Sequence, residues 1–326
     1  MDINLLVVLK LLAALALIIV LLIANSVVMV WLERKIAGFI QRRPGPYEVG
    51  PHGLFQTIAD AVKLLTKQLV IPANSDRLLF FMGPVLAMFP MFLLFLVIPF
   101  GPILTGLEVE LGVLLILAFA GFEGLAVLTG GWASNNKYSL LGAARGVCQI
   151  VAYEIPLILA ILAVAFMCGS LNLSVINQTQ GNWPWEWHLF RQPLAFFIFI
   201  ICMFGETNRA PFDLPEGESE LTGGFHTEYS GMGFALYFMA EYTSMLLVSF
   251  LAVIFFLGGP GGPLAPGVWW TFIKMGFLMT LMIWVRWTFP RVRFDQLLNI
   301  NWKWLLPLGL LNLWLTALVL NLARGF

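Results

Sequence analysis

Runs of apolar residues long enough to cross a bilayer, separated by polar stretches, recur along the whole chain. A helix that crosses the hydrocarbon core needs about 20 mostly apolar residues, and a soluble core does not require so many runs of that length. The pattern therefore predicts an all-α polytopic membrane protein with eight transmembrane helices in a single membrane domain, residues 1–326. The predicted spans cover residues 8–32, 78–98, 110–129, 147–168, 192–206, 232–257, 267–288 and 304–323.

The first polar stretch, residues 33–77, contains a different pattern. Over residues 54–69 apolar side chains recur at helical spacing while amides and charges line the opposite face, which is the pattern of an amphipathic helix. We expect this helix to lie in the membrane interface of the first loop rather than to cross the bilayer. A plain surface anchor is an equally good interpretation of the same residues.

The fifth span is short. Its uncharged part, residues 193–205, contains 13 residues and would reach about 20 Å as a helix, whereas the hydrocarbon core is about 30 Å thick. Pro211 and Pro215 then prevent the helix from continuing. Irregular backbone at that depth is tolerated only inside protein or beside water, so we expect the start of the following loop, residues 206–231, to be buried in the bundle.

Composition and charge narrow the class further. Hydrophobic residues make up 60% of the chain and charged residues 11%, against about 25% charged in soluble domains. The net charge is zero, so nothing favours nucleic acid as a partner. Lys and Arg total 14 in the odd-numbered loops and three on the opposite side. The positive-inside rule therefore predicts cytoplasmic odd-numbered loops, with both termini on the outside.

Acidic residues are concentrated where a lipid-facing segment would have few. The 36 residues from Glu206 to Glu241 hold seven of the 18 acids and a single base, Arg209. Glu123 and Glu154 lie inside predicted spans, where a charged group costs about 2.5–3.5 kcal/mol unless it faces a partner or water. A series of such carboxyl groups is what a proton relay requires. For a single one, such as Glu123, a structural acid is an equally good reading.

Basic residues near these acids suggest partners for them. Arg145, Gln149 and Tyr153 recur at positions i, i+4 and i+8 and share one helix face, which makes Arg145 the obvious countercharge at the cytoplasmic end. Pro156 would free a main-chain carbonyl close to Glu154 and bend that helix. Lys274 lies within a span and either pairs inside the bundle or extends its ammonium group to the surface.

Signatures of a bound redox group or nucleotide are missing from the sequence. It contains no glycine-rich dinucleotide loop, no Walker motif and no His or Cys set at metal-ligand spacing. The three cysteines do not have the spacing of an iron–sulfur or disulfide framework. We therefore expect no cofactor on this chain alone, so partner subunits would supply any redox chemistry.

Several motifs resemble one family over nearly the whole chain. They are LERK at 32–35, RPGP at 43–46, QTIADAVK at 56–63, GWASNNKYSLLG at 131–142 and ETNRAPFDLPE at 206–216. The sequence resembles the membrane subunit of NADH-quinone oxidoreductase, respiratory complex I, whose mitochondrial counterpart is NADH dehydrogenase subunit 1. The resemblance implies a multi-pass subunit of the bacterial inner membrane in a proton-translocating enzyme, with NADH, FMN and iron–sulfur clusters on partner subunits and quinone as substrate.

The resemblance also implies roles for particular residues. A chamber through which quinone enters would be lined by one set: Glu33, Arg34, Asp60, Lys63, Arg209 and Phe212. A proton path would use another: Glu123, Glu154, Glu206, Asp213, Glu216, Glu218, Glu220, Glu228 and Glu241, with Arg145. Two alternatives remain open, the homologous subunit of an energy-converting hydrogenase or formate-linked complex, and a stand-alone ion or proton transporter.

Overall fold

The computed structural model describes residues 5–99, 109–263 and 266–324, and the regular structure of these residues is helical throughout. Among them, seven helical segments are long and apolar enough to cross a membrane, which confirms the prediction of an all-helical, multi-pass membrane protein. The segments are Leu12–Ile40 of α1 (Leu5–Ile40), α3 (Arg77–Val97), α4 with α5 (Gly112–Ala133), α6 (Lys137–Cys168), α11 (Gly231–Phe256), α12 (Val268–Thr288) and the run Phe294–Ala323 that α13 (Phe294–Ile300) begins and α14 (Leu306–Arg324) ends.

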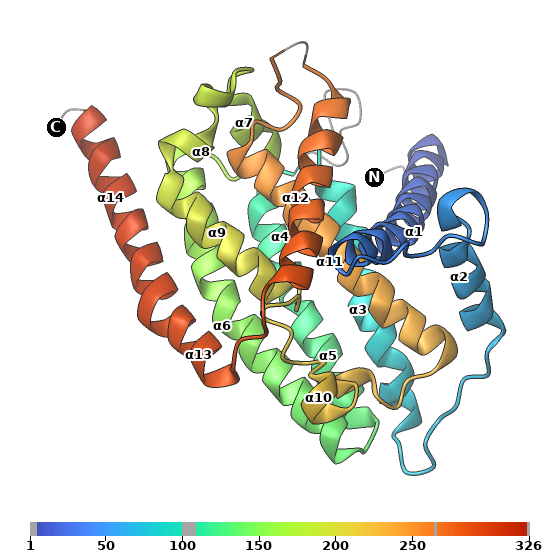
Figure 1. Ribbon diagram of the computed structural model, residues 1–326. Helices are drawn as coiled ribbons and strands as arrows, with labels where there is room; N and C mark the ends of the chain where they lie inside the picture. The colour runs from blue at the N-terminus through green and yellow to red at the C-terminus, as the bar shows by residue number, and fades with distance from the viewer. Residues whose placement is uncertain (1–4, 100–108, 264–265, 325–326) are drawn as a thin grey trace.

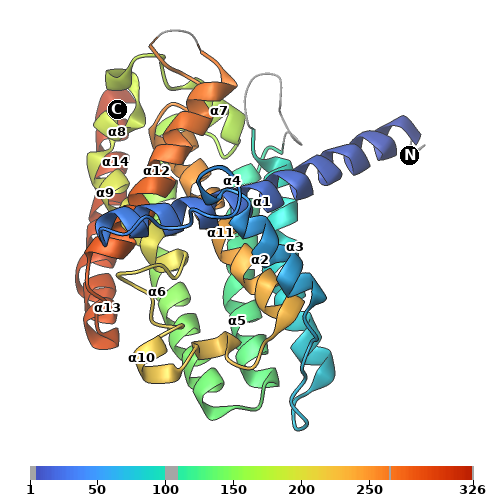
Figure 2. The same cartoon turned by 45° about the vertical axis from the view of Figure 1, so that its right-hand side comes forward.

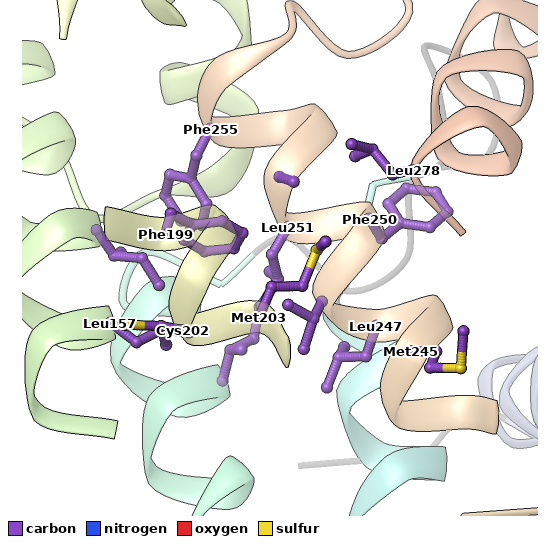
Figure 3. Packing of buried hydrophobic residues seen from close by; sticks show 14 of the residues in the cluster. Leu157, Phe199, Cys202, Met203, Met245, Leu247, Phe250, Leu251, Phe255 and Leu278 are labelled. Carbon is purple, nitrogen blue, oxygen red and sulfur yellow. The ribbon is translucent and has the colours of Figure 1, made fainter. Parts of the chain in front are cut away.

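The helix α11 is the centre of the bundle. It packs against α3, α9, α12 and α1, and its side chains are almost all buried from residue 240 to 256. In Figures 1 and 2, α14 stands at one flank and α1 runs at a steep angle to the other helices, so that its amino end projects from the bundle. The apolar core between α11 and α9 contains Phe199, Cys202, Met203, Leu247 and Leu251 (Figure 3).

The fifth predicted span is the helix α9 (Pro193–Glu206), which has 14 residues and falls below the length of the other seven segments. The chain leaves the helical conformation directly after it, and the next residues, Thr207, Asn208 and Arg209, are all buried. Gln149 of α6 holds this turn, since its Nε2 donates to Gly205 O at 2.8 Å and to Phe212 O at 2.7 Å. The expected burial of the loop start is therefore confirmed.

Two other spans differ from their predicted outlines. The first helix continues to Ile40, so the LERK motif lies on a helix and not in a loop. The third is interrupted at Gly121, where α4 (Gly112–Ala120) ends and α5 (Phe122–Ala133) begins. A Cβ atom on Gly121 would lie 3.3 Å from Oε1 of Glu154, so the missing side chain lets the Glu154 carboxyl group approach this break.

Pro156 in α6 leaves a main-chain carbonyl without its helical donor, as predicted. Pro156 has no N–H to donate to the carbonyl of Ala152, and Asn301 Nδ2 donates to that oxygen instead, at 2.5 Å. Asn301 opens a short π-helical turn (Asn301–Leu305) between α13 and α14. The freed carbonyl thus fastens α14 to α6, and the two helices pack together.

The carboxyl end of α11 is capped by a buried ammonium group. Lys274 of α12 directs Nζ at three carbonyl oxygens, at 2.5 to 3.1 Å, and lies 4.1 Å from the ring centre of Trp187. One of these oxygens belongs to the C-cap residue of α11 and the other two to the turn that follows the helix, so Lys274 pairs inside the bundle and does not extend to the surface. The three oxygens belong to Leu257, Gly259 and Gly261.

The short helices lie at the two ends of the bundle or beside it. At one end α7 (Leu173–Gln178) and α8 (His188–Arg191) lie near the turn that follows α11, and at the other end lies α10 (Glu218–Leu221) (Figure 1). The first loop contains α2 (Gln56–Thr66) within the segment predicted to be amphipathic. This helix packs beside α1 and α11 and leaves Ile58, Val62 and Leu65 exposed. The loops that follow odd-numbered predicted spans contact one another at the α10 end, as shown by Asn136 to Glu228 and Val292 to Pro211.

Candidate functional site

An open cavity of about 570 Å³ lies where α1, α11 and α12 meet the turn that follows α1. Its wall is mostly apolar but includes four charged residues. Residues from four segments line it: Val30, Glu33, Arg34, Ala37 and Gly38 of α1; Arg43, Pro44, Gly45 and Pro46 of the turn; Phe238 and Tyr242 of α11; and Arg286 and Trp287 of α12. A second cavity of about 500 Å³ shares Pro44 and Gly45 with it and reaches Gln56 at the start of α2.

The turn forms one wall because it folds back on α1. Arg43 N donates to Gly38 O at 2.7 Å, and Lys35 Nζ donates to Pro44 O at 3.2 Å. A Cβ atom on Gly38 would lie 2.9 Å from both Arg43 O and Gly45 N. A side chain at position 38 would therefore push the turn away and change the cavity.

Glu33 connects the cavity to the interior of the bundle. Its Oε1 accepts from Arg286 Nη1 at 2.7 Å, and its Oε2 accepts from Arg209 Nη1 at 3.0 Å and from Tyr242 at 2.6 Å. Glu33 and Arg209 are both buried. A buried carboxylate of this kind is stable only because its partners are charged and complete its hydrogen bonds.

Arg209 lies between two carboxylates. Besides its hydrogen bond to Glu33, its Nη2 is 3.8 Å from Oε2 of Glu241, and its guanidinium carbon lies 4.3 Å from the ring centre of Tyr242. Its Nε and Nη2 have no hydrogen-bond acceptor among the described residues. One arginine thus joins a group on the cavity wall to an acid in the middle of the bundle.

Glu33 and Glu241, which lie within 4 Å of Arg209, form the first part of a set of acids paired with arginine. A second part of this arginine-paired set lies at the α10 end of the bundle. Asp213 accepts from Arg291 Nη2 at 2.9 Å. Burial and the negative charge of Glu216 raise the pKa of Asp213 to about 7, against the opposing effect of Arg291 and Arg286. Burial also opposes ionisation of Glu216, but a hydrogen bond with Glu241 and nearby positive charges outweigh it and lower the pKa of Glu216.

Three other acids lie deeper and have no basic partner. Glu206 interacts electrostatically with Glu123 and Glu154, and none of the ion pairs of the described residues includes any of the three. Glu123 and Glu206 are both buried and line a small cavity of about 20 Å³. The acids therefore fall into two sets, one neutralised by arginine and one in an apolar setting.

The structure places the remaining predicted path residues at the loop end. Arg145 donates to Glu220 at 2.5 Å and lowers the pKa of that exposed carboxylate. Asn136 donates to Glu228 at 2.5 Å beside a separate surface cavity. The side chain of Glu218 lies outside the described residues. Glu241 lies beside Arg209 and therefore belongs to the acids that pair with arginine.

Of the six predicted quinone contacts, only two line the large cavity. Glu33 and Arg34 line the large cavity, and Arg209 stands behind Glu33. Asp60 accepts from Arg34 at 2.5 Å at the surface. Neither Lys63 nor Phe212 lines the cavity: Lys63 is exposed on α2, and Phe212 is buried with its ring 5.3 Å from that of Tyr153.

Sequence reasoning overlooked three residues of this site. Arg286 was counted only toward orientation, because it stands at the end of a span where a basic residue is ordinary. Tyr242 and Phe238 are aromatic residues among many apolar ones. The one available signal for Tyr242 was its position beside Glu241 in a span. Contacts across more than 200 positions, such as Tyr242 to Glu33, give no local pattern.

Comparison with known proteins points to one family. The sequence model of the NADH dehydrogenase family matches residues 12–317. The H-subunit of NADH-quinone oxidoreductase from Desulfotalea psychrophila is 50% identical over 304 residues, which cover 90% of this chain and 91% of the relative. The proteins of the same name from Carboxydothermus hydrogenoformans (46% identical; 93% and 87% covered) and Thermomicrobium roseum (46%; 89% and 90%) are similar over comparable lengths.

Proposed function

The chain belongs to the NADH dehydrogenase family, and from that premise we propose that it forms the chamber through which quinone enters a proton-pumping NADH-quinone oxidoreductase and couples quinone reduction to proton movement. The names of its relatives favour this over a hydrogenase subunit or a stand-alone transporter. In this proposal NADH, FMN and the iron–sulfur clusters belong to partner subunits of complex I, and quinone is the substrate.

The large cavity supports the quinone part of the proposal. Its volume of about 570 Å³ lies in the range of small-molecule sites, about 300–1,000 Å³. Val30, Ala37, Phe238 and Trp287 offer apolar contact to a long isoprenoid tail, while Glu33, Arg34 and Arg286 provide charged groups. The neighbouring cavity at Gln56 extends the open space along the first loop.

The two sets of acids support the coupling part. Arg209 lies between Glu33 on the cavity wall and Glu241. A change of charge at Glu33 therefore changes how strongly Arg209 stabilises the negative charge of Glu241. Glu206, Glu123 and Glu154 follow deeper in the bundle, and two carboxyl groups that share an apolar site are most stable when a proton is shared between them. The path we propose runs from Asp213 and Glu216 through Glu241 to Glu206, Glu154 and Glu123, while Glu218, Glu220 and Glu228 stand at its mouth.

The proposal includes a membrane arrangement. We assign eight spans by adding α9 to the seven longer segments, with the turn of residues 207–216 buried at its end. We place α2 in the interface on the cytoplasmic side, where its exposed apolar side chains would meet lipid. Both termini then lie outside, and the loop end that carries α10 faces the cytoplasm and the peripheral arm.

The observation that carries the proposal is the position of Arg209, which donates to Glu33 of the cavity at 3.0 Å and lies 3.8 Å from Glu241. The test is to replace Glu216 by Gln in the intact complex. Assembly should be unchanged, because Gln has nearly the same shape. Quinone reduction and proton pumping should fall by about 100-fold or more, the usual loss when a group that transfers a proton is removed. Inhibitor-sensitive quinone reductase activity and acidification of proteoliposomes measure both.

Glu186→Gln, in the loop at the opposite end of the bundle, is the control and should behave as the wild type. Glu220→Gln removes the partner of Arg145 at the mouth of the path and should lower both activities with assembly intact. Wild-type turnover in both Glu216→Gln and Glu220→Gln would contradict the proposed acid path.

A further inference from the structure

An open groove of about 430 Å³ runs along the outer face of α3, apart from the large cavity. It is lined by Arg77, Leu78, Phe81, Met82 and Val85. All of these residues except Arg77 are apolar, and in Figures 1 and 2 the amino end of α3 lies on the side of the bundle away from α14. The groove shares no residue with the large cavity or with the proposed acid path.

The groove belongs to an exposed apolar stripe that covers only part of α3. Leu78, Phe81, Val85 and Phe89 recur at helical spacing, and each is between 50% and 70% exposed. The stripe ends at Phe89, since every residue from 90 to 97 is buried or half-buried. From Leu78 to Phe89 the helix rises about 17 Å, which is close to the depth of one leaflet, half of a hydrocarbon core of about 30 Å.

The inner face of α3 is closely packed, which holds the stripe outward. A Cβ atom on Gly83 would lie 3.2 Å from the Cα atom of Gly130 in α5 and would clash with the hydroxyl group of Tyr237 in α11. Asp76 N donates to Ala133 O at 3.1 Å, which joins the amino end of α3 to the carboxyl end of α5. The stripe is therefore a fixed part of the bundle surface.

Arg77 is an exposed cation at the end of this stripe. None of the ion pairs among the described residues includes it. The acid beside it, Asp76, caps α3 instead, since its Oδ1 accepts from Leu78 N at 3.1 Å. Trp132, at the adjoining end of α5, is 67% exposed, and exposed tryptophan is typical of the level of the lipid headgroups. An apolar stripe that begins at an unpaired guanidinium matches an amphiphile with a negative head and an apolar tail.

We propose that this groove binds an anionic phospholipid, whose phosphate lies beside Arg77 and whose acyl chain follows the stripe to Phe89. The planar guanidinium of arginine matches the geometry of two phosphate oxygens. A spanning helix of a neighbouring subunit would extend through both leaflets, whereas the exposed face of α3 ends at the depth of one. The proposal rests on the membrane location of α3 and not on the proposed roles in quinone entry and proton movement.

The test places the photoreactive residue p-benzoylphenylalanine at position 81 of the intact complex, in nanodiscs of equal parts phosphatidylcholine and phosphatidylglycerol. Mass spectrometry then identifies the molecule that irradiation attaches to this position. We expect phosphatidylglycerol adducts to exceed phosphatidylcholine adducts about fivefold, the factor equivalent to about 1 kcal/mol for one basic residue at an anionic membrane surface. The control has the same residue in place of Trp314, which is exposed in the middle of α14, and should give equal adducts.

Two substitutions separate the charge from the groove. The excess of phosphatidylglycerol should disappear in Arg77→Gln and persist in Arg77→Lys, which keeps the positive charge. Because Arg77 is exposed, both variants should assemble, and the adduct ratio of the chain that retains Arg77 decides the proposal even without them.

Three results would overturn the proposal. Equal adducts of the two lipids at position 81 would show an apolar contact that does not select the headgroup. A cross-link to a peptide of another subunit would show that the groove is a protein interface. An unchanged excess of phosphatidylglycerol in Arg77→Gln would show that Arg77 does not hold the phosphate.

Discussion

Arg209 is a single buried side chain that lies within ion-pair distance of two acids, Glu33 and Glu241. It is a buried arginine, and it neutralises Glu33 at 3.0 Å while its other amino group is 3.8 Å from Glu241. Removing one member of a buried ion pair leaves the other charge uncompensated, at a cost of about 3–5 kcal/mol. Arg209 therefore compensates the charge of both acids at once, and the two acids are linked through it.

The raised pKa of Asp213 predicts that the stability of the folded protein depends on pH. Its pKa of about 7 lies above the ordinary value of 3.8, so the folded protein binds this proton more tightly than the unfolded chain. The stabilisation is complete at low pH and is lost as the pH rises to about 7, with a slope of at most about 1.4 kcal/mol per pH unit. The groups that face Asp213 are Glu216, Arg291 and Arg286.

We expect Asp213→Asn to remove this dependence. The Tm of the wild-type complex should fall relative to that of the variant between about pH 4 and 7 and stay parallel to it above that range. Asp295→Asn, an exposed substitution at the start of α13, is the control. Parallel Tm curves over the whole range would show that Asp213 holds no extra proton in the folded protein.

Among the helices, α11 is held at its carboxyl end by side chains from other elements. Lys274 donates to three carbonyls there, Gln180 donates to Ile254 O at 2.7 Å, and His188 contacts Phe255 O at 2.9 Å through Nδ1. Because Glu241 lies on the same helix, these caps help to fix the position of its carboxyl group.

Lys274→Met tests the importance of this cap. The variant keeps most of the side-chain volume but leaves three buried carbonyls without their donor, at about 1–3 kcal/mol for each unsatisfied group. We expect the purified complex to lose stability by about 3 kcal/mol or more, measured as a lower Tm and faster thermal inactivation. Lys303→Met, at an exposed position of the π-helical turn, should be neutral, and a neutral Lys274→Met would show that the carbonyls find other donors.

At the scale of the whole molecule, the two ends of the bundle differ in charge and in content. The end near α10 gathers Arg145, Glu220, Asp213 and Arg291. The opposite end holds Trp183, Trp185 and Trp187 of the segment between α7 and α8, and the cap of α11. The positive-inside rule assigns the first end to the cytoplasm, and this orientation remains a prediction.

Cysteine labelling tests the orientation. With Cys148, Cys168 and Cys202 replaced by Ala, single cysteines are placed at exposed positions as Lys137→Cys and Gln178→Cys. An impermeant maleimide applied to spheroplasts should label Gln178→Cys alone, and inverted vesicles should label Lys137→Cys alone. The reverse pattern would invert the proposed topology.

The sequence by itself determined the helical membrane class, most of the spans and the buried turn after α9. These follow from local properties, namely the length of apolar runs, the helical period and the inability of proline to continue a helix. The interruption at Gly121 and the extension of α1 to Ile40 were not predictable in this way, because each depends on what packs beside the segment. Gly121, for example, lies where the Glu154 carboxyl group would be only 3.3 Å from an added Cβ atom.

The tertiary structure alone decided which acids have a countercharge. Sequence reasoning grouped Glu206 with Asp213, Glu216 and Glu241, its neighbours along the chain. Folding instead brings Glu241 to Arg209, which also pairs with Glu33 from 176 positions away, and it places Glu206 beside Glu123 in an apolar cavity. The energy of a buried carboxyl group depends on partners within a few ångströms, and in a helical bundle those partners come from other helices.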